Sequence, residues 1–100
     1  VKKLFMKAGE CCSLQYHELK RETIYVLSGK LKLYIGNSID SLEERIMVAN
    51  EYVNIEPYTI HRMEGIDDST YLESSTNELW DVIRLDDKYK RENTQETDYK

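Results

Sequence analysis

Both histidines of the sequence lie where they could help to bind a metal ion. Gln15 and His17 are two residues apart, so on a β-strand their side chains project from the same face. Glu22 begins the next apolar run, which could fold back beside them, and His61 follows the rigid Pro57 by four residues. Amide, imidazole and carboxylate groups are suitable metal donors. We therefore predict a metal site formed by Gln15, His17, Glu22 and His61.

Mixed nitrogen and oxygen donors suit several divalent ions. We favour zinc, with manganese, iron or nickel as alternatives. The sequence also leaves open a metal-free site, in which the four polar side chains hydrogen-bond to one another inside the mouth of a barrel.

Three basic side chains flank the predicted ligands. Lys20 and Arg21 precede Glu22, and Arg62 follows His61. We predict that Lys20, Arg21 and Arg62 bind an anionic substrate group through charge-assisted hydrogen bonds. The alternative for Lys20 and Arg21 is a solvated loop. For Arg62 it is a surface ion pair, because this residue would face outward from the strand that carries His61. No residue is assigned a catalytic role.

Short strands must position these residues. Runs at 23–27, 31–35, 46–48, 51–55 and 69–73 are rich in β-branched, aromatic or alternating apolar residues, which predicts strands. Ser28-Gly29-Lys30 predicts the tip of a β-hairpin between the first two. Residues 41–45 fit either a turn of helix or a charged loop. Several short strands without alternating helices predict an all-β fold, an antiparallel barrel or sandwich.

The chain length predicts one domain. One hundred residues can bury one modest core, so we do not expect an enzyme with a separate nucleotide-binding half. We expect a barrel over residues 1–85. Residues 86–100 are almost wholly polar and predict a solvated tail.

The charge balance is acidic, with 14 Lys and Arg against 19 Asp and Glu, a formal net charge of −5. A nucleic-acid partner is not expected, because such proteins carry a basic stripe. A membrane partner is not expected either, since no apolar run approaches the roughly 18 residues that span a bilayer and no leader is seen. Cys11 and Cys12 are adjacent and predict free thiols, because a mutual disulfide would be strained. We expect a cytoplasmic protein.

The order of the candidate ligands resembles the first motif of the cupin superfamily. That motif reads Gly, five residues, His-x-His, three or four residues, Glu, six residues, Gly. Here Gly9 is followed by five residues, Gln15-x-His17, four residues, Glu22, six residues and Gly29. Gln15 replaces the first histidine. The resemblance implies a small antiparallel cupin β-barrel, similar to a jelly roll, that commonly pairs into a homodimer.

A second cupin motif is matched more loosely. It reads Gly, five residues, Pro, and then His five residues after that Pro. Asn50 stands at the Gly position, Glu56 at the Pro position, and His61 is in register. Asn tolerates the left-handed turn conformation that Gly would adopt there. The resemblance implies that His61 completes the ligand set.

Three further segments are similar to the C-terminal cupin domain of bifunctional mannose-6-phosphate isomerase/mannose-1-phosphate guanylyltransferases. They are residues 13–17 (SLQYH), 26–29 (VLSG) and 81–91 (DVIRLDDKYKR). The similarity covers about residues 4 to 91. A Gln-x-His pair with Glu and His is also the zinc set of the zinc-dependent mannose-6-phosphate isomerases. The bifunctional group has a run of histidines where this chain has His17-Glu18-Leu19, so we expect a lower metal affinity here.

The resemblance implies a metal-binding, mannose-6-phosphate isomerase-like cupin that binds or acts on a sugar or sugar phosphate. In an isomerase, the metal polarises the carbonyl and hydroxyl oxygens while a base moves a proton between C1 and C2 through an enediol. Glu73 is a candidate for that base only by default. The alternative is a non-catalytic cupin that binds a small molecule or serves in assembly, with or without metal. From the length we expect no guanylyltransferase half.

Overall fold

The computed structural model describes residues 1–78 and 80–86, and within these residues there are nine strands and no helix. None of the described residues belongs to a helix that could span a membrane. The strands are β1 (Lys2–Met6), β2 (Leu14–Tyr16), β3 (Glu22–Ser28), β4 (Lys30–Gly36), β5 (Glu43–Val48), β6 (Tyr52–Ile55), β7 (Ile60–Gly65), β8 (Ser69–Ser75) and β9 (Ile83–Asp86).

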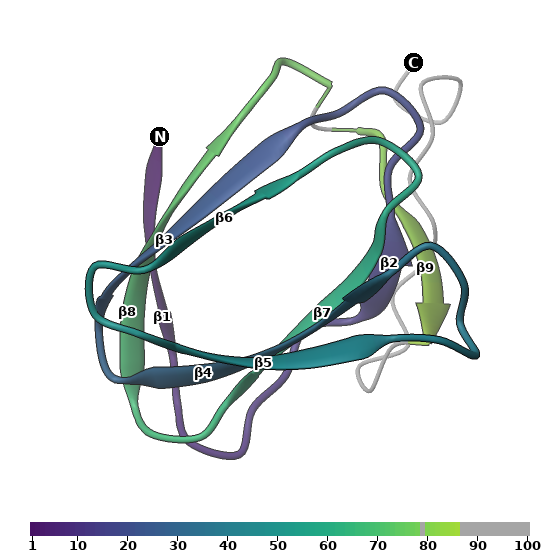
Figure 1. Ribbon diagram of the computed structural model, residues 1–100. Helices are drawn as coiled ribbons and strands as arrows, with labels where there is room; N and C mark the ends of the chain where they lie inside the picture. The colour runs from purple at the N-terminus through teal and green to yellow at the C-terminus, as the bar shows by residue number, and fades with distance from the viewer. Residues whose placement is uncertain (79, 87–100) are drawn as a thin grey trace.

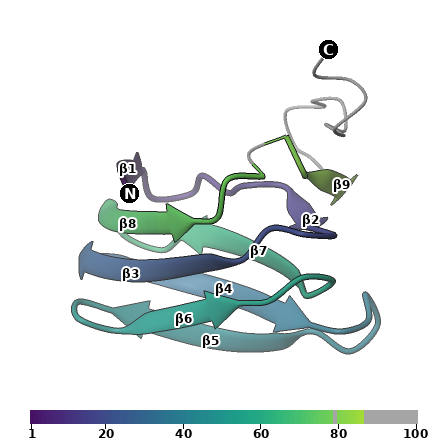
Figure 2. The ribbon, with the colours of Figure 1, turned by 90° about the horizontal axis from the view of Figure 1, so that it is seen from above.

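The strands form two antiparallel sheets that face each other (Figures 1 and 2). The order is β1-β8-β3-β6 in the first sheet and β5-β4-β7-β2-β9 in the second. The prediction of a small all-β antiparallel fold is confirmed. Within the described part of the chain, the two sheets do not close into one continuous hydrogen-bonded barrel. The fold is thus an open barrel, and its interior lies between the sheets.

Period-two alternation builds the core. Ile24 and Val26 on β3 face Leu31 and Leu33 on β4 across the interior, while their neighbours in sequence point outward. Burying one such side chain contributes about 1.5–3 kcal/mol to folding. The buried core consists of Met6, Ile24, Val26, Leu31, Leu33, Met47, Val53, Ile55, Met63 and Tyr71.

The predicted hairpin at Ser28-Gly29-Lys30 is wrong. β3 pairs with β6 and β8, whereas β4 pairs with β5 and β7, so Gly29 is a corner where the chain passes from one sheet to the other. Its φ is 90°, and a Cβ atom there would clash with Ser69 Oγ and with the Asp68 carbonyl oxygen. The turn signal marks the break between two strands, but local sequence does not specify which strands then pair.

The structure tests the predictions for residues 41–45 and, in part, for residues 86–100. Residues 43–45 open β5, which pairs antiparallel with β4, so these three residues form neither the helical turn nor the charged loop that the sequence suggested. Asp86 is the last residue of β9, one residue beyond the boundary predicted for the barrel. The rest of the predicted tail, residues 87–100, lies outside the described residues.

Candidate metal site

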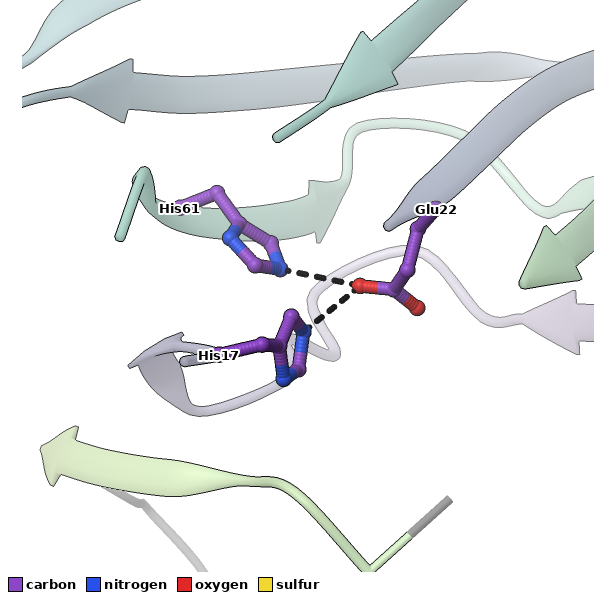
Figure 3. A group of neighbouring side chains, drawn as sticks. All are labelled: His17, Glu22 and His61. Carbon is purple, nitrogen blue, oxygen red and sulfur yellow. Dashed lines mark hydrogen bonds and ion pairs between the residues drawn. The ribbon is translucent and has the colours of Figure 1, made fainter. Parts of the chain in front are cut away.

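Three of the four predicted ligands converge on one point in the interior (Figure 3). Nε2 of His17 lies 2.7 Å from Oε1 of Glu22, and Nε2 of His61 lies 3.4 Å from the same oxygen. Their ligand atoms all lie within 4.8 Å of one another. All three side chains are buried, with exposed fractions of 5% or less. The group of His17, Glu22 and His61 forms a His-Glu-His cluster.

Both sheets contribute to the cluster. Glu22 is the first residue of β3 in the first sheet, while His61 is on β7 in the second. His17 follows the end of β2, in the loop that leads to β3. On β7, His61 and Met63 point inward and alternate with outward-facing residues. Because the two sheets face each other, His61 comes together between them with His17 and Glu22, which are far from it in the sequence.

The histidine rings are oriented by backbone carbonyl groups. Nδ1 of His17 lies 2.6 Å from the Asp81 carbonyl oxygen, and Nδ1 of His61 lies 2.9 Å from that of Thr59. Because a carbonyl oxygen can only accept, each Nδ1 must carry the hydrogen and donate it. In the neutral ring Nε2 then holds a lone pair, which faces the Glu22 carboxylate. This arrangement requires positive charge at the centre, either as protons on the rings or as a bound cation.

Charged neighbours surround the carboxylate. Burial raises the pKa of Glu22, but the hydrogen bonds with His17 and His61 outweigh it and hold that pKa well below its usual value. Nζ of Lys20 lies 3.8 Å from the other carboxylate oxygen, and Lys20 is only 6% exposed. Burial, and then the charge of Glu22, raise the pKa of the half-buried Glu73 to about 7. Glu22 thus has both basic groups and a second carboxyl group, that of Glu73, as its neighbours.

Comparison with known proteins places this geometry in context. No protein-family model matches the chain. Mannose-1-phosphate guanylyltransferase 2 of Escherichia coli O157:H7 is 32% identical over a 97-residue alignment, which covers 92% of this chain and 19% of that protein. The chain therefore spans about a fifth of the length of this curated relative.

Solved structures share the architecture. The capsular polysaccharide assembling protein CapF from Staphylococcus aureus matches with a TM-score of 0.72 at 20% identity, over 84% of this chain and 27% of CapF. A protein from Acidithiobacillus ferrooxidans, provisionally named a sugar phosphate isomerase, matches with a TM-score of 0.64 at 18% identity, over 73% of this chain and 46% of that one. Both have cupin-type folds. The chain has a cupin fold.

The predicted cupin resemblance is thereby confirmed. In this cupin, Gln15 pairs directly with His61 across β2 and β7, so both side chains lie on the same face of the sheet. Gln15 is half-buried, and its Oε1 accepts a hydrogen bond of 2.6 Å from Ser13 Oγ. The amide group is thus on the same face of the sheet as His61 and is held by a buried hydroxyl group.

The three predicted substrate-binding residues of the cupin lie in three different places. Lys20 is beside the cluster, close to Glu22. Arg21 is exposed and forms an ion pair of 2.8 Å with Glu56. Arg62 points to the opposite face of β7 from His61, where its Nε donates to the Cys12 carbonyl oxygen at 3.1 Å and its guanidinium pairs with Asp86 at 3.2 Å. Only Lys20 contacts the His-Glu-His cluster.

Arg62 lines a separate cavity of about 170 Å³. The cavity lies on the outer side of the second sheet, because Tyr34 and Glu64 line it from the outward positions of β4 and β7. Tyr34 donates a 3.0 Å hydrogen bond from its hydroxyl to Glu64 Oε1. The other lining residues are Cys11, Leu14 and Leu42.

Asp81 is a buried residue that the sequence pattern did not single out. Its carboxylate accepts hydrogen bonds from the backbone N–H groups of Glu18, Leu19 and Lys20. Burial raises the pKa of Asp81, but these backbone donors outweigh it and the net pKa is lowered. A signal was present, because Asp81 is a lone charge within the apolar run at 79–83. Buried carboxylates require partners, so such a residue is a candidate for a structural or functional role.

Proposed function

We propose that this cupin binds a divalent metal through His17, Glu22 and His61, with Gln15 as a fourth ligand, and that it binds or acts on a sugar or sugar phosphate. The observation that carries the proposal is the convergence of the Nε2 atoms of two buried histidines on one carboxylate oxygen in the interior. The sugar class is supported by the curated relative, a mannose-1-phosphate guanylyltransferase, and by the structural likeness to a protein provisionally named a sugar phosphate isomerase.

The donor set fits a metal such as zinc. Ligands about 2.0–2.1 Å from a tetrahedral zinc ion are about 3.3 Å apart, and the two Nε2–Oε1 distances of 2.7 and 3.4 Å lie on either side of that value. The backbone carbonyl groups that hold each Nδ1 are the partners that metal-binding histidines ordinarily have. Zinc is our first choice, with manganese, iron and nickel as alternatives.

Two side chains could take part in aldose–ketose isomerisation. A bound divalent ion would polarise the carbonyl and hydroxyl oxygens of the sugar. Lys20, whose ammonium group lies beside Glu22, would donate a hydrogen bond to the substrate oxygen that gains negative charge. Glu73 shares the inward face with Glu22, because its partner Ile24 is two residues from Glu22 on β3. It would move the proton between C1 and C2.

Net charge affects how a phosphate group would be held. A protein with a net charge of −5 gives an anionic ligand no long-range attraction. The phosphate would have to be bound locally, by the metal and Lys20, with the exposed Arg21 near the start of β3 as a further cation.

A second candidate function is a binding-only cupin without metal. It is favoured by the contacts of Glu22, which has charged or polar partners at both of its oxygens within the protein. With protonated histidines, the His-Glu-His cluster and Lys20 form a self-contained network. A neutral small molecule would suit such a site better than a sugar phosphate.

We also propose a cytoplasmic homodimer. Cys11 and Cys12 are free thiols, which persist in reducing compartments. β1 and β6 are the outer strands of the first sheet, and pairing between copies is a common way to cover such edges. Light scattering of the purified protein gives the molar mass, and a monomer at micromolar concentration would contradict this part of the proposal.

Elemental analysis and an activity assay together test the proposal. The protein is purified without chelators, its metal content is measured, and interconversion of mannose 6-phosphate and fructose 6-phosphate is followed. The same measurements on His17→Ala, His61→Ala and the outward-facing control Thr23→Ala identify the ligands. Stoichiometric metal that is lost only in the histidine variants supports the metal site. Absence of metal would leave the metal-free cupin, and metal without turnover would leave a binding role.

A further inference from the structure

The position of His17 is not set by a β-ladder. β2 ends at Tyr16 and β3 begins at Glu22, so His17 and Lys20 both lie in the connecting loop. Even so, His17 is fully buried and Lys20 almost so. A loop that carries two buried functional groups needs other partners for its backbone, because buried N–H groups are costly when unpaired.

Asp81 supplies those partners from a distant part of the sequence. Its Oδ1 accepts from the Glu18 N–H at 3.1 Å, and its Oδ2 accepts from the N–H groups of Leu19 and of Lys20, the latter at 2.9 Å. The carbonyl oxygen of the same residue accepts from Nδ1 of His17 at 2.6 Å. Asp81 is itself only 1% exposed. One residue therefore binds the imidazole ring and the three backbone groups that follow it.

Tyr58 holds the same histidine through its backbone, whereas Asp81 binds its ring. The Tyr58 N–H donates to the His17 carbonyl oxygen at 2.6 Å. Tyr58 has a φ of 64°, a left-handed conformation that is unfavourable for a side chain of this kind. Its ring is exposed and stacks on Tyr16 with centroids 6.1 Å apart. An unfavourable backbone conformation beside a candidate site is held only where surrounding contacts stabilise it.

We propose that Asp81 is the positioning residue of the metal site, and that the Tyr58 N–H assists it by holding the backbone of His17. Asp81 fixes the hydrogen on Nδ1 of His17, which leaves Nε2 free to bind the metal, and it holds the loop so that Lys20 reaches Glu22. The inference rests on the proposed function for the identity of the ligand, but the clamp on His17 can be measured without metal.

Asp81→Asn is the first test. The amide keeps the shape of the side chain but places an N–H₂ group among three backbone donors. We expect zinc affinity, measured by competition with a chelating dye, to fall by about 10- to 100-fold, because the loop that carries His17 loses the carboxylate that holds its backbone, an effect comparable to loss of a group that orients a metal ligand. Met47→Ala is the control, because it opens a hole in the core on β5, away from the cluster. It should reduce stability while leaving zinc affinity within about twofold.

Nitrogen NMR of the histidine rings provides a readout that general destabilisation would not change. In the metal-free protein, the His17 ring should show Nδ1–H in wild type. Asp81→Asn keeps the backbone carbonyl that accepts from Nδ1 but loosens the loop, so it should alter the tautomer balance of His17 by moving the ring away from that carbonyl, with His61 unchanged. An unchanged His17 spectrum together with unchanged zinc affinity would overturn the inference. If wild-type protein binds no zinc but His17 still responds to Asp81→Asn, the clamp stands and the proposed metal function fails.

A pair of variants at Tyr58 keeps the inference testable if Asp81→Asn does not fold. Tyr58→Gly retains the N–H and tolerates the positive φ, so zinc affinity should stay within about twofold. Tyr58→Pro removes the N–H and forbids the positive φ, so zinc affinity should fall by about tenfold or more. Equal affinities in the two variants would show that the His17 backbone needs no such support, which contradicts the proposal.

Discussion

The ammonium group of Lys20 lies 3.8 Å from Oε2 of Glu22, while both histidines contact Oε1 of the same carboxylate. The two oxygens of Glu22 therefore face different chemical groups. Oε1 faces the imidazole groups and the proposed metal, and Oε2 faces an ammonium proton donor. This division separates residues that would bind a metal from a residue that would contact substrate, and each can be tested separately.

Glu22→Gln should abolish tight metal binding. The variant removes the charge that balances His17, His61 and Lys20, so it should also lower the free energy of unfolding by about 3 kcal/mol. Urea unfolding and zinc titration measure the two effects. Glu56→Gln is the matched control, because Glu56 is exposed and its ion pair with Arg21 should contribute less than about 1 kcal/mol. Equal losses in the two variants would contradict the assigned role of Glu22.

Lys20→Met should separate metal binding from turnover. Methionine fills a similar volume without the charge, so zinc should still bind. If the protein is an isomerase, kcat should fall by about 100-fold or more, as when one donor to a developing negative charge is removed. Lys32→Met, which removes an ammonium group paired with Glu44 on the outer face of β4, should change kcat by less than about threefold. A Lys20→Met enzyme with wild-type kcat would remove Lys20 from the mechanism.

Gly29→Ala should destabilise the protein more than Gly9→Ala. Both glycines have φ near 90°, so both substitutions carry a conformational cost of about 1–2 kcal/mol. A Cβ atom added at Gly9 would meet open space, whereas one at Gly29 would press against Ser69 and Asp68. We expect a total loss of about 3 kcal/mol or more at Gly29, measured by urea unfolding. Similar losses of unfolding free energy at both sites would mean that the backbone around Gly29 shifts to make room for the added Cβ atom, contrary to this prediction.

Alkylation should distinguish the two thiols. Burial raises the pKa of the Cys12 thiol, and its sulfur accepts a hydrogen bond from the Met63 N–H at 3.1 Å. Because a raised pKa shifts formation of the reactive thiolate to higher pH, Cys12 should react slowly near pH 8. Cys11 lines the outer cavity beside Arg62 and should react first. Mass spectrometry of the iodoacetamide-treated native protein should show one adduct, and Cys11→Ser should show almost none. Two adducts formed at equal rates would contradict this assignment.

Motif spacing was enough to find the His-Glu-His cluster, because His17, Glu22 and His61 each stand at a position that resembles a cupin ligand. Alternation along one strand also indicated that Arg62 could face away from His61. These inferences depend on short-range geometry, which sequence periodicity encodes directly.

Other features depend on contacts between distant segments. Lys20 has the character of a solvated residue, and only the fold of the loop after β2 buries it. The change of sheet at Gly29 depends on which strands pair, which turn residues do not determine. The role of Asp81 requires knowing that β9 docks beside β2, a pairing between segments far apart in the chain.

The hydrogen bonds of Asp81 also affect the order in which parts of the chain can fold during synthesis. Its backbone donors at Glu18, Leu19 and Lys20 precede it by 61 to 63 residues. During synthesis, the loop of His17 emerges from the ribosome long before its acceptors, and it stays without them until Asp81 docks. Local detachment of Asp81 in the finished protein would likewise release His17, so its opening would set an upper limit on how long the proposed metal stays bound.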